Sequence, residues 1–130
     1  MAVINGSVTG CSLIASNHGQ GGELRKAFLC SAAFAAYTGS SDTYTVTGIN
    51  TAVAAHERNG KTLTLMTVAP FSGGVDTAGQ LVYIAAAPTL SNPTTTGDIA
   101  GNLTAADGST ELTASTACQG VQFIAVCKEA

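Results

Sequence analysis

The segment TYTVTGINTAVAAHERNGKTLTLMTV, from Thr43 to Val68, carries the clearest local pattern in the chain. Its first four residues are β-branched or aromatic, which favours a strand. After these residues, the side chains of Ile49, Ala52, Val53 and His56 recur at the spacing of a helix. Asn59-Gly60 is typical of a helix end, and Lys61 to Val68 then alternates polar and apolar residues over most of its length. The segment therefore predicts a strand, one short helix over about residues 49–58, and a second strand.

Alternating apolar residues predict further strands on both sides of this segment. Leu24 to Ala36 places its large side chains on one parity, although its alanines leave a helix open as an alternative. Gln80 to Ala87 is apolar on both faces, which is typical of an inner strand or of a strand covered by a partner. Gly120 to Lys128 also alternates and predicts a closing strand. Pro70 and Gly73-Gly74 are expected to end the strand that begins at Lys61.

Together these segments predict a mainly β protein with a single domain over residues 1–130. We expect an antiparallel β-sandwich or small barrel of five or six strands with one short helix. The length of 130 residues is sufficient for one hydrophobic core. The β-rich body would span residues 23–87, and the closing strand would lie in 117–130.

Two segments hold little apolar material for that core. Residues 1–22 are rich in glycine and predict an extended N-terminal arm with at most one short strand. Residues 88–116 are rich in Thr, Ser and Gly, with turn signals at Asn92-Pro93 and Asp107-Gly108, and predict a projecting hairpin or loop. Both segments are therefore expected to contact other subunits. The candidate contacts are their apolar residues Val3, Ile4, Val8, Leu13, Ile14, Leu90, Ile99 and Leu103.

The low charge of the chain indicates the class of protein. Charged residues make up only 10% of the sequence, against about a quarter in an ordinary soluble domain. A surface of hydroxyls, methyl groups and backbone is easily desolvated against another protein. The composition therefore favours a subunit of an assembly over a free catalyst. A net charge of -3, with no basic run longer than two residues, predicts no binding to nucleic acid or to a membrane surface.

The four cysteines, Cys11, Cys30, Cys118 and Cys127, have no zinc-ligand spacing. We interpret them as small buried hydrophobic residues. A late-forming disulfide, Cys11–Cys30 or Cys118–Cys127, is the main alternative, and a metal or nucleophile role has the smallest weight.

No motif for catalysis or cofactor binding is present. His18 and His56 lack motif neighbours, and the chain has no GxSxG, HExxH or Walker sequence. Acidic residues in the polar segment, Asp98, Asp107 and Glu111, are too sparse for a calcium loop. We expect no enzyme activity, no cofactor, no metal site and no small-molecule substrate.

The string TVTGINTAVAAHERNGKTLTL, Thr45 to Leu65, resembles the small structural proteins encoded beside the major capsid protein in tailed bacteriophages. Glu23-Leu24-Arg25-Lys26 at the start of a strand adds to this resemblance, which covers residues 22–87. Members of this decoration, or cement, family are small, β-rich and oligomeric on a capsid shell, and carry no catalytic residues. The resemblance implies the major capsid protein, and further copies of this chain in a dimer or trimer, as partners.

The location implied is the outer surface of the virion capsid, after synthesis in the host cytoplasm. A slightly acidic protein would be repelled by packaged DNA, which also favours the outer surface. No apolar run approaches the ~18 residues of a membrane span, and the N-terminus lacks signal-peptide features. Two alternatives stay open: another virion component such as a tail or fibre β-module, and, with least weight, a small thiol-dependent enzyme.

Overall fold

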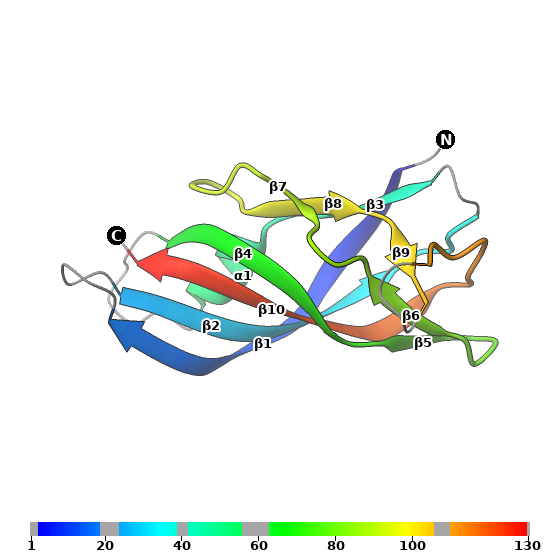
Figure 1. The fold of residues 1–130 in the computed structure, drawn as a ribbon, viewed down its shortest axis with the longest axis horizontal. Coiled ribbons are helices and arrows are strands. Elements are labelled where there is room, and N and C mark those ends of the chain that lie inside the picture. The colour runs from blue at the N-terminus through cyan, green and yellow to red at the C-terminus, as the bar shows by residue number, and fades with distance from the viewer. Residues whose placement is uncertain (1–2, 19–23, 39–41, 56–62, 106–109, 130) are drawn as a thin grey trace.

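A computed structural model describes residues 3–18, 24–38, 42–55, 63–105 and 110–129 (Figure 1). Strands dominate, which confirms the mainly β prediction. The elements are β1 (Val3–His18), β2 (Leu24–Phe34), β3 (Thr43–Val46), α1 (Ile49–Ala54), β4 (Leu63–Ser72), β5 (Gly74–Asp76), β6 (Leu81–Ile84), β7 (Thr89–Ser91), β8 (Asp98–Gly101), β9 (Leu103–Thr104) and β10 (Cys118–Glu129).

These strands form one curled, open sheet. Its order is β7-β8-β3-β1-β2-β10-β5-β6-β9, and β4 pairs with β10 on the same side as β5. Every pair is antiparallel except β1–β3, which is parallel over Val3–Gly6. The sandwich or small barrel of five or six strands is therefore corrected to a half-barrel with nine strands in its main path.

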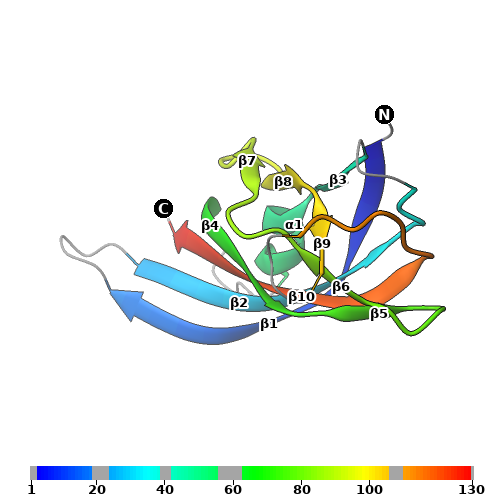
Figure 2. The same ribbon diagram turned by 45° about the vertical axis from the view of Figure 1, so that its right-hand side comes forward.

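The long strands explain why one sheet replaces two. In Figures 1 and 2, β7, β8 and β3 lie above β2, β10 and β4, and β1 crosses from the upper part to the lower part. β1 pairs with β3 on one side near its start and with β2 on the other side along its length. Register shifts at Val8/Gly10, Leu13/Ala15 and Cys118/Val121 mark bulges, which increase local twist. Bent strands thus carry a single sheet around the core.

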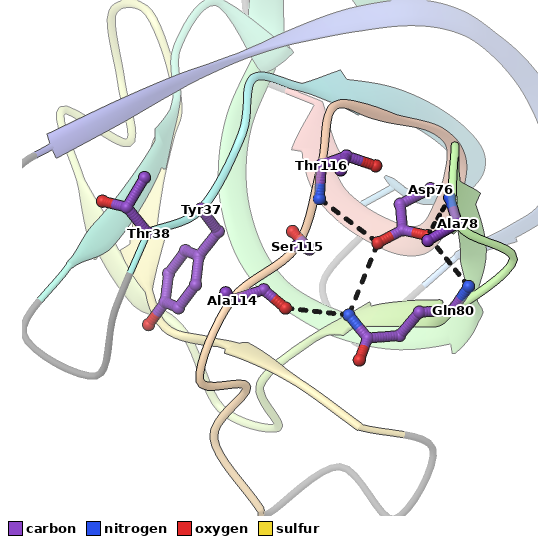
Figure 3. Close-up of a pocket in the computed structure, with 8 residues that line it drawn as sticks. All are labelled: Tyr37, Thr38, Asp76, Ala78, Gln80, Ala114, Ser115 and Thr116. Carbon is purple, nitrogen blue, oxygen red and sulfur yellow. Dashed lines mark hydrogen bonds between the residues drawn. The ribbon is translucent and has the colours of Figure 1, made fainter.

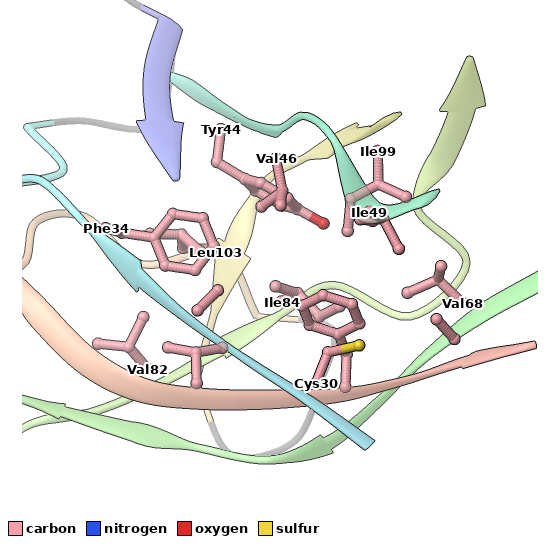
Figure 4. Close-up of a cluster of buried hydrophobic side chains, with 14 of the residues drawn as sticks. Cys30, Phe34, Tyr44, Val46, Ile49, Val68, Val82, Ile84, Ile99 and Leu103 are labelled. Atoms are coloured by element: carbon pink, nitrogen blue, oxygen red, sulfur yellow. The ribbon is translucent and has the colours of Figure 1, made fainter. Parts of the chain in front are cut away.

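The core lies in the concavity of this sheet. Phe34 and Tyr44 stack edge to face, with ring centroids 5.3 Å apart. Figure 4 shows Cys30 and Val82 on one side of the cluster and Val46, Ile49 and Ile99 on the other. Burial in β2 and β10 follows the predicted alternation, since Phe28, Cys30, Ala32, Phe34, Val121, Phe123, Ala125 and Cys127 are all buried.

The helix is shorter than the predicted range of 49–58. α1 ends at Ala54, and residues 56–62, with His56 and Asn59-Gly60, lie outside the described residues. Six residues do not form a stable helix alone. The start of α1 is held by the turn that precedes β8. The Ile49 N–H donates to Gly97 O at 3.0 Å, and the Asn50 N–H donates to Thr96 O at 2.9 Å. Buried Ile49 and Val53 attach it to the core.

The N-terminal arm is corrected to a sheet strand. Val3–His18 forms β1, the longest strand, in place of an arm with at most one short strand. Its glycines are compatible with a strand because close packing requires one of them. A Cβ at Gly6 would lie 2.7 Å from Cδ1 of Phe34 and 3.0 Å from Cγ2 of Val46. The missing side chain therefore lets β2 and β3 both approach β1.

The polar segment 88–116 is also part of the body and not a projecting hairpin. β7, β8 and β9 join the sheet, and Ile99, Leu103 and Leu112 enter the core. A few well-spaced apolar residues suffice because side-chain and backbone hydrogen bonds stabilise the turns. The Asn92 amide donates to Asp98 Oδ2 at 2.8 Å, and Gly97 N–H donates to Asn92 O at 2.8 Å. Residues 106–109, including Asp107-Gly108, lie outside the described part.

The remaining predicted strands are present, although most begin or end a few residues away from the predicted positions. β2, β3, β6 and β10 lie where alternation placed them, and β6 pairs on both sides, with β5 and β9. β4 runs through Pro70 to Ser72, although Pro70 was expected to end it. Proline is tolerated there because the described pairing of β4 is with β10 alone, so its missing N–H can face away.

Candidate interaction surface

The structure separates the predicted contact residues into core and surface positions. Ile4, Ile99 and Leu103 are buried and are withdrawn as candidate contacts, because another chain could not reach them without unfolding. Val8 and Leu90 are half-buried against the core. Val3, Leu13 and Ile14 remain, with exposed fractions of 60%, 45% and 50%.

Leu13 and Ile14 belong to a part of β1 that pairs on one side only. The parallel partner β3 reaches no further than Gly6, and beyond it the described pairing of β1 is with β2. Both ribbon views show this outer side of β1 without a neighbouring described element (Figures 1 and 2). We call Val8–Ser16 the open edge. An open edge presents a row of unpaired backbone N–H and C=O groups to other chains.

The open edge contains two bulges but neither a charged residue nor proline to block pairing. Natural edges carry charged residues, especially lysine, or proline. Val8–Ser16 contains neither, and Ser12–Ser16 are exposed on both faces of the strand. Bulges beside Thr9 and Ile14 interrupt the ladder, so a regular stretch remains at Gly10–Leu13. The geometry suits a short added strand flanked by apolar side chains.

A second exposed apolar group lies on β4, β5 and β6. Val75 and Leu81 are directly opposed across the β5–β6 pair, so they share one face of the sheet. Phe71 precedes them near the end of β4, and all three are about half exposed. We call Phe71, Val75 and Leu81 the outer patch. The sequence signal for it was the strand Gln80 to Ala87, whose two apolar faces suggested a covering partner.

A pocket of about 450 Å³ lies between the β5–β6 turn and residues 114–116 (Figure 3). Asp76 Oδ1 accepts hydrogen bonds from the N–H groups of Ala78 and Gln80, both at 2.9 Å, and Oδ2 accepts one from Thr116 N–H at 3.2 Å. The Gln80 amide donates to Ala114 O at 2.9 Å. Asp76 therefore joins the turn to the segment before β10.

These contacts indicate that Asp76 has a structural role, as a joint between two segments, and not a catalytic one. The Gln80 N–H, followed by those of Thr116 and Ala78, holds the pKa of Asp76 below its usual range, so the carboxylate is a poor base at neutral pH. Tyr37 lines the same pocket, and burial is the main cause of its raised pKa. Its hydroxyl lies 2.8 Å from Asp42 O and 2.9 Å from Glu111 Oε2. These polar groups bind one another.

The cysteines fall into two arrangements. Cys118 and Cys127 both lie on β10, nine positions apart, so about 30 Å of extended strand separates them. A Cys118–Cys127 disulfide is therefore excluded. Cys11 and Cys30 instead lie directly opposite each other on β1 and β2. The sequence predicted that the cysteines are small buried hydrophobic residues. This is confirmed for Cys30, Cys118 and Cys127, whereas Cys11 is half-buried.

Other candidates for chemistry have structural contacts or lie outside the described residues. Asp98 accepts hydrogen bonds from Gly48 N–H and the Asn92 amide, and Glu111 lies beside the Tyr37 hydroxyl. Asp107 and His56 are outside the described ranges. Within those ranges no group of three or more His, Cys, Asp or Glu side chains could hold a metal ion.

The described residues also contain no helix of the length and apolar character that crossing a membrane requires.

Comparisons with protein-family models, with curated proteins and with solved structures found no match. The candidate surface therefore rests on its own geometry.

Proposed function

We propose that this protein decorates and stabilises a phage head, binding across major capsid protein subunits on the outer surface without catalysing a reaction. The observation that carries the proposal is the open edge, an uncharged strand border with Leu13 and Ile14 exposed. The resemblance of Thr45 to Leu65 to decoration proteins supplies the biological context. Location on the virion and synthesis in the host cytoplasm are parts of the same proposal.

Strand addition is the mode of binding that fits the open edge. A strand of a neighbouring subunit would pair with Gly10–Leu13, whose backbone supplies the hydrogen bonds. Leu13 and Ile14 would supply apolar area, worth roughly 25 cal/mol for each Å² removed from water. No charged side chain of Val8–Ser16 would have to be desolvated, so the usual penalty for burying a charge does not arise.

The outer patch supports binding across more than one subunit. In Figure 1 the free end of the β1–β2 pair and the β5–β6 turn lie at opposite ends of the long axis. A protein that links neighbours needs at least two separate contact surfaces. The open edge on β1 and the outer patch on β4, β5 and β6 supply two apolar surfaces on different strands.

The test is co-sedimentation with empty shells assembled from the major capsid protein encoded in the same genome. Ile14→Lys places a charge on the open edge, and Thr94→Lys places the same charge on an exposed turn as a matched control. We expect wild type and Thr94→Lys to bind at a fixed ratio and Ile14→Lys to bind at least about tenfold more weakly. Circular dichroism checks that both variants are folded.

Each other outcome has a defined meaning. Equal binding of all three proteins would reject the open edge as the contact. Wild type that forms a discrete oligomer by light scattering but ignores shells would favour a tail or fibre component. A monomer indifferent to shells would reject the proposed function.

A further inference from the structure

Cys11 and Cys30 are arranged for a bond that the structure does not contain. They are opposed residues of an antiparallel pair, in the regular stretch between the two bulges of β1. Opposed Cα atoms in such a pair lie about 4.5–5.5 Å apart, within the Cα separation that a disulfide spans. The two thiol groups lie close enough for each to shift the other's pKa. The pairing of β1 with β2 therefore brings the two cysteines within the range of a disulfide.

The two thiols differ in access and in acidity. Cys11 is half-buried, whereas Cys30 is buried, so a reagent from solution reaches Cys11 first. The hydrogen bond from Cys30 is the main cause of a lowered pKa of Cys11, while the same bond and burial raise the pKa of Cys30. Cys11 is therefore the attacking thiolate, and Cys30 is the resolving thiol.

We propose that Cys11 and Cys30 are a redox modification site that forms a disulfide on reaction with a small-molecule disulfide such as oxidised glutathione. The Cys11 thiolate attacks one glutathione sulfur, forms a mixed disulfide and releases a glutathione thiolate. Cys30 then loses its proton and attacks Cys11 Sγ, which releases the second glutathione thiolate. The protein loses two electrons and two protons, and the glutathione disulfide is reduced to two thiols.

The bond would fix the open edge to the body. β2 is paired with β10 along most of its length, whereas the outer half of β1 has β2 as its described partner. A Cys11–Cys30 disulfide encloses residues 12–29 and prevents β1 from separating from β2 there. Formation of the bond does not depend on the proposed function, although a shell protein released from a reducing cytoplasm would meet such an oxidant.

The experiment treats the folded, full-length protein with oxidised glutathione and removes the reagent. The protein is then unfolded in guanidinium chloride with excess iodoacetamide, which blocks the remaining thiols, and its mass is measured. We expect two blocked thiols in place of four, and a mass about 2 Da lower before blocking. Trypsin cuts after Arg25 and Lys26, so the two cysteines lie on separate peptides unless the disulfide links them. The linked peptide pair is the expected product.

Two variants and a stability measurement decide the result. Cys11→Ser removes the attacking thiol and should abolish the link, while Cys118→Ser changes an uninvolved cysteine and should leave it. The oxidised wild type should melt roughly 10 °C higher, an increase that dithiothreitol reverses. A stable glutathione adduct on Cys11, or four blocked thiols in the wild type, would each overturn the proposal.

Discussion

The two ends of β1 have similar residues and opposite surroundings. Near the start, Ile4 is buried and pairs with Tyr44 of β3, and the Phe34 ring packs over Gly6. Further along, Ser12–Ser16 are exposed on both faces, although Leu13 and Ile14 are as apolar as Ile4. The difference arises from β3, whose pairing ends at Gly6. It teaches that neighbouring strands, and not hydrophobicity alone, decide which residues stabilise the fold and which are available for contacts.

The largest expected effect compares a core residue with an open-edge residue. Ile99→Ala leaves a cavity under β8 and should lower the free energy of unfolding by about 2–4 kcal/mol. Leu13→Ala removes similar apolar volume at the open edge and should change it by no more than about 0.5 kcal/mol. Urea unfolding measures both variants. Similar losses would mean that the open edge is covered within the monomer, and the comparison would fail.

A smaller effect distinguishes two buried tyrosines of the body. The Tyr37 hydroxyl has Asp42, Glu111 and Asn102 as neighbours within hydrogen-bond distance, whereas the buried Tyr44 hydroxyl has no partner among the described residues. Tyr37→Phe should therefore destabilise the protein by about 1–2 kcal/mol. Tyr44→Phe should be neutral or stabilise it by up to about 1 kcal/mol, because an unpaired buried hydroxyl is removed.

Urea unfolding of the two Phe variants under the same conditions is the measurement. A loss in Tyr44→Phe equal to that in Tyr37→Phe would show that the Tyr44 hydroxyl is satisfied in solution. Both hydroxyl groups would then stabilise the fold, because the Phe variants keep the buried rings.

The smallest effect concerns pH and the Asp76 joint. The N–H groups of Gln80, Thr116 and Ala78 lower the pKa of Asp76 in the folded protein from its ordinary value of 3.8. A lowered folded pKa means that this stabilisation is fully present above pH 3.8 and is lost as the pH falls through the folded pKa. The stability difference between wild type and Asp76→Asn should therefore shrink on acidification.

Urea midpoints measured from neutral pH down to about pH 2 test this sign. A difference that stays constant over that range would show that folding does not lower the pKa of Asp76. The open edge has no charged side chain between Val8 and Ser16 and should contribute nothing to this pH dependence.

Most strand positions were predictable because alternation is a local property. Phe28 to Phe34 and Val121 to Cys127 have the predicted buried parity, and β3 has the predicted ends. The contacts that position α1 were not predictable, because the N–H groups at its start bind the 96–97 turn, more than forty residues away in the chain. The joint at Asp76 was also missed, since its partner Thr116 lies in a segment without any motif.

The candidate surface was predicted only in part. Val3, Leu13 and Ile14 are exposed as a contact role requires, but composition could not separate them from Ile4, Ile99 and Leu103. All six are apolar residues in segments poor in apolar neighbours. Their burial depends on which face of the curled sheet each side chain occupies: Val3 and Ile4 both pair with β3, yet Val3 is exposed and Ile4 is buried. The curl of the sheet leaves no local trace in the chain.

By itself, the sequence determined the β class, the parity of the long strands, the sparse charge and the lack of a catalytic motif, because these follow from residue type and spacing. Only the tertiary structure decided that one curled sheet encloses the core, that residues 88–116 belong to it, and that β1 has an open edge. It also selected Cys11–Cys30 over Cys118–Cys127. The physical reason is that strand pairing joins residues far apart in the chain, and pairing sets both burial and the distance between thiols.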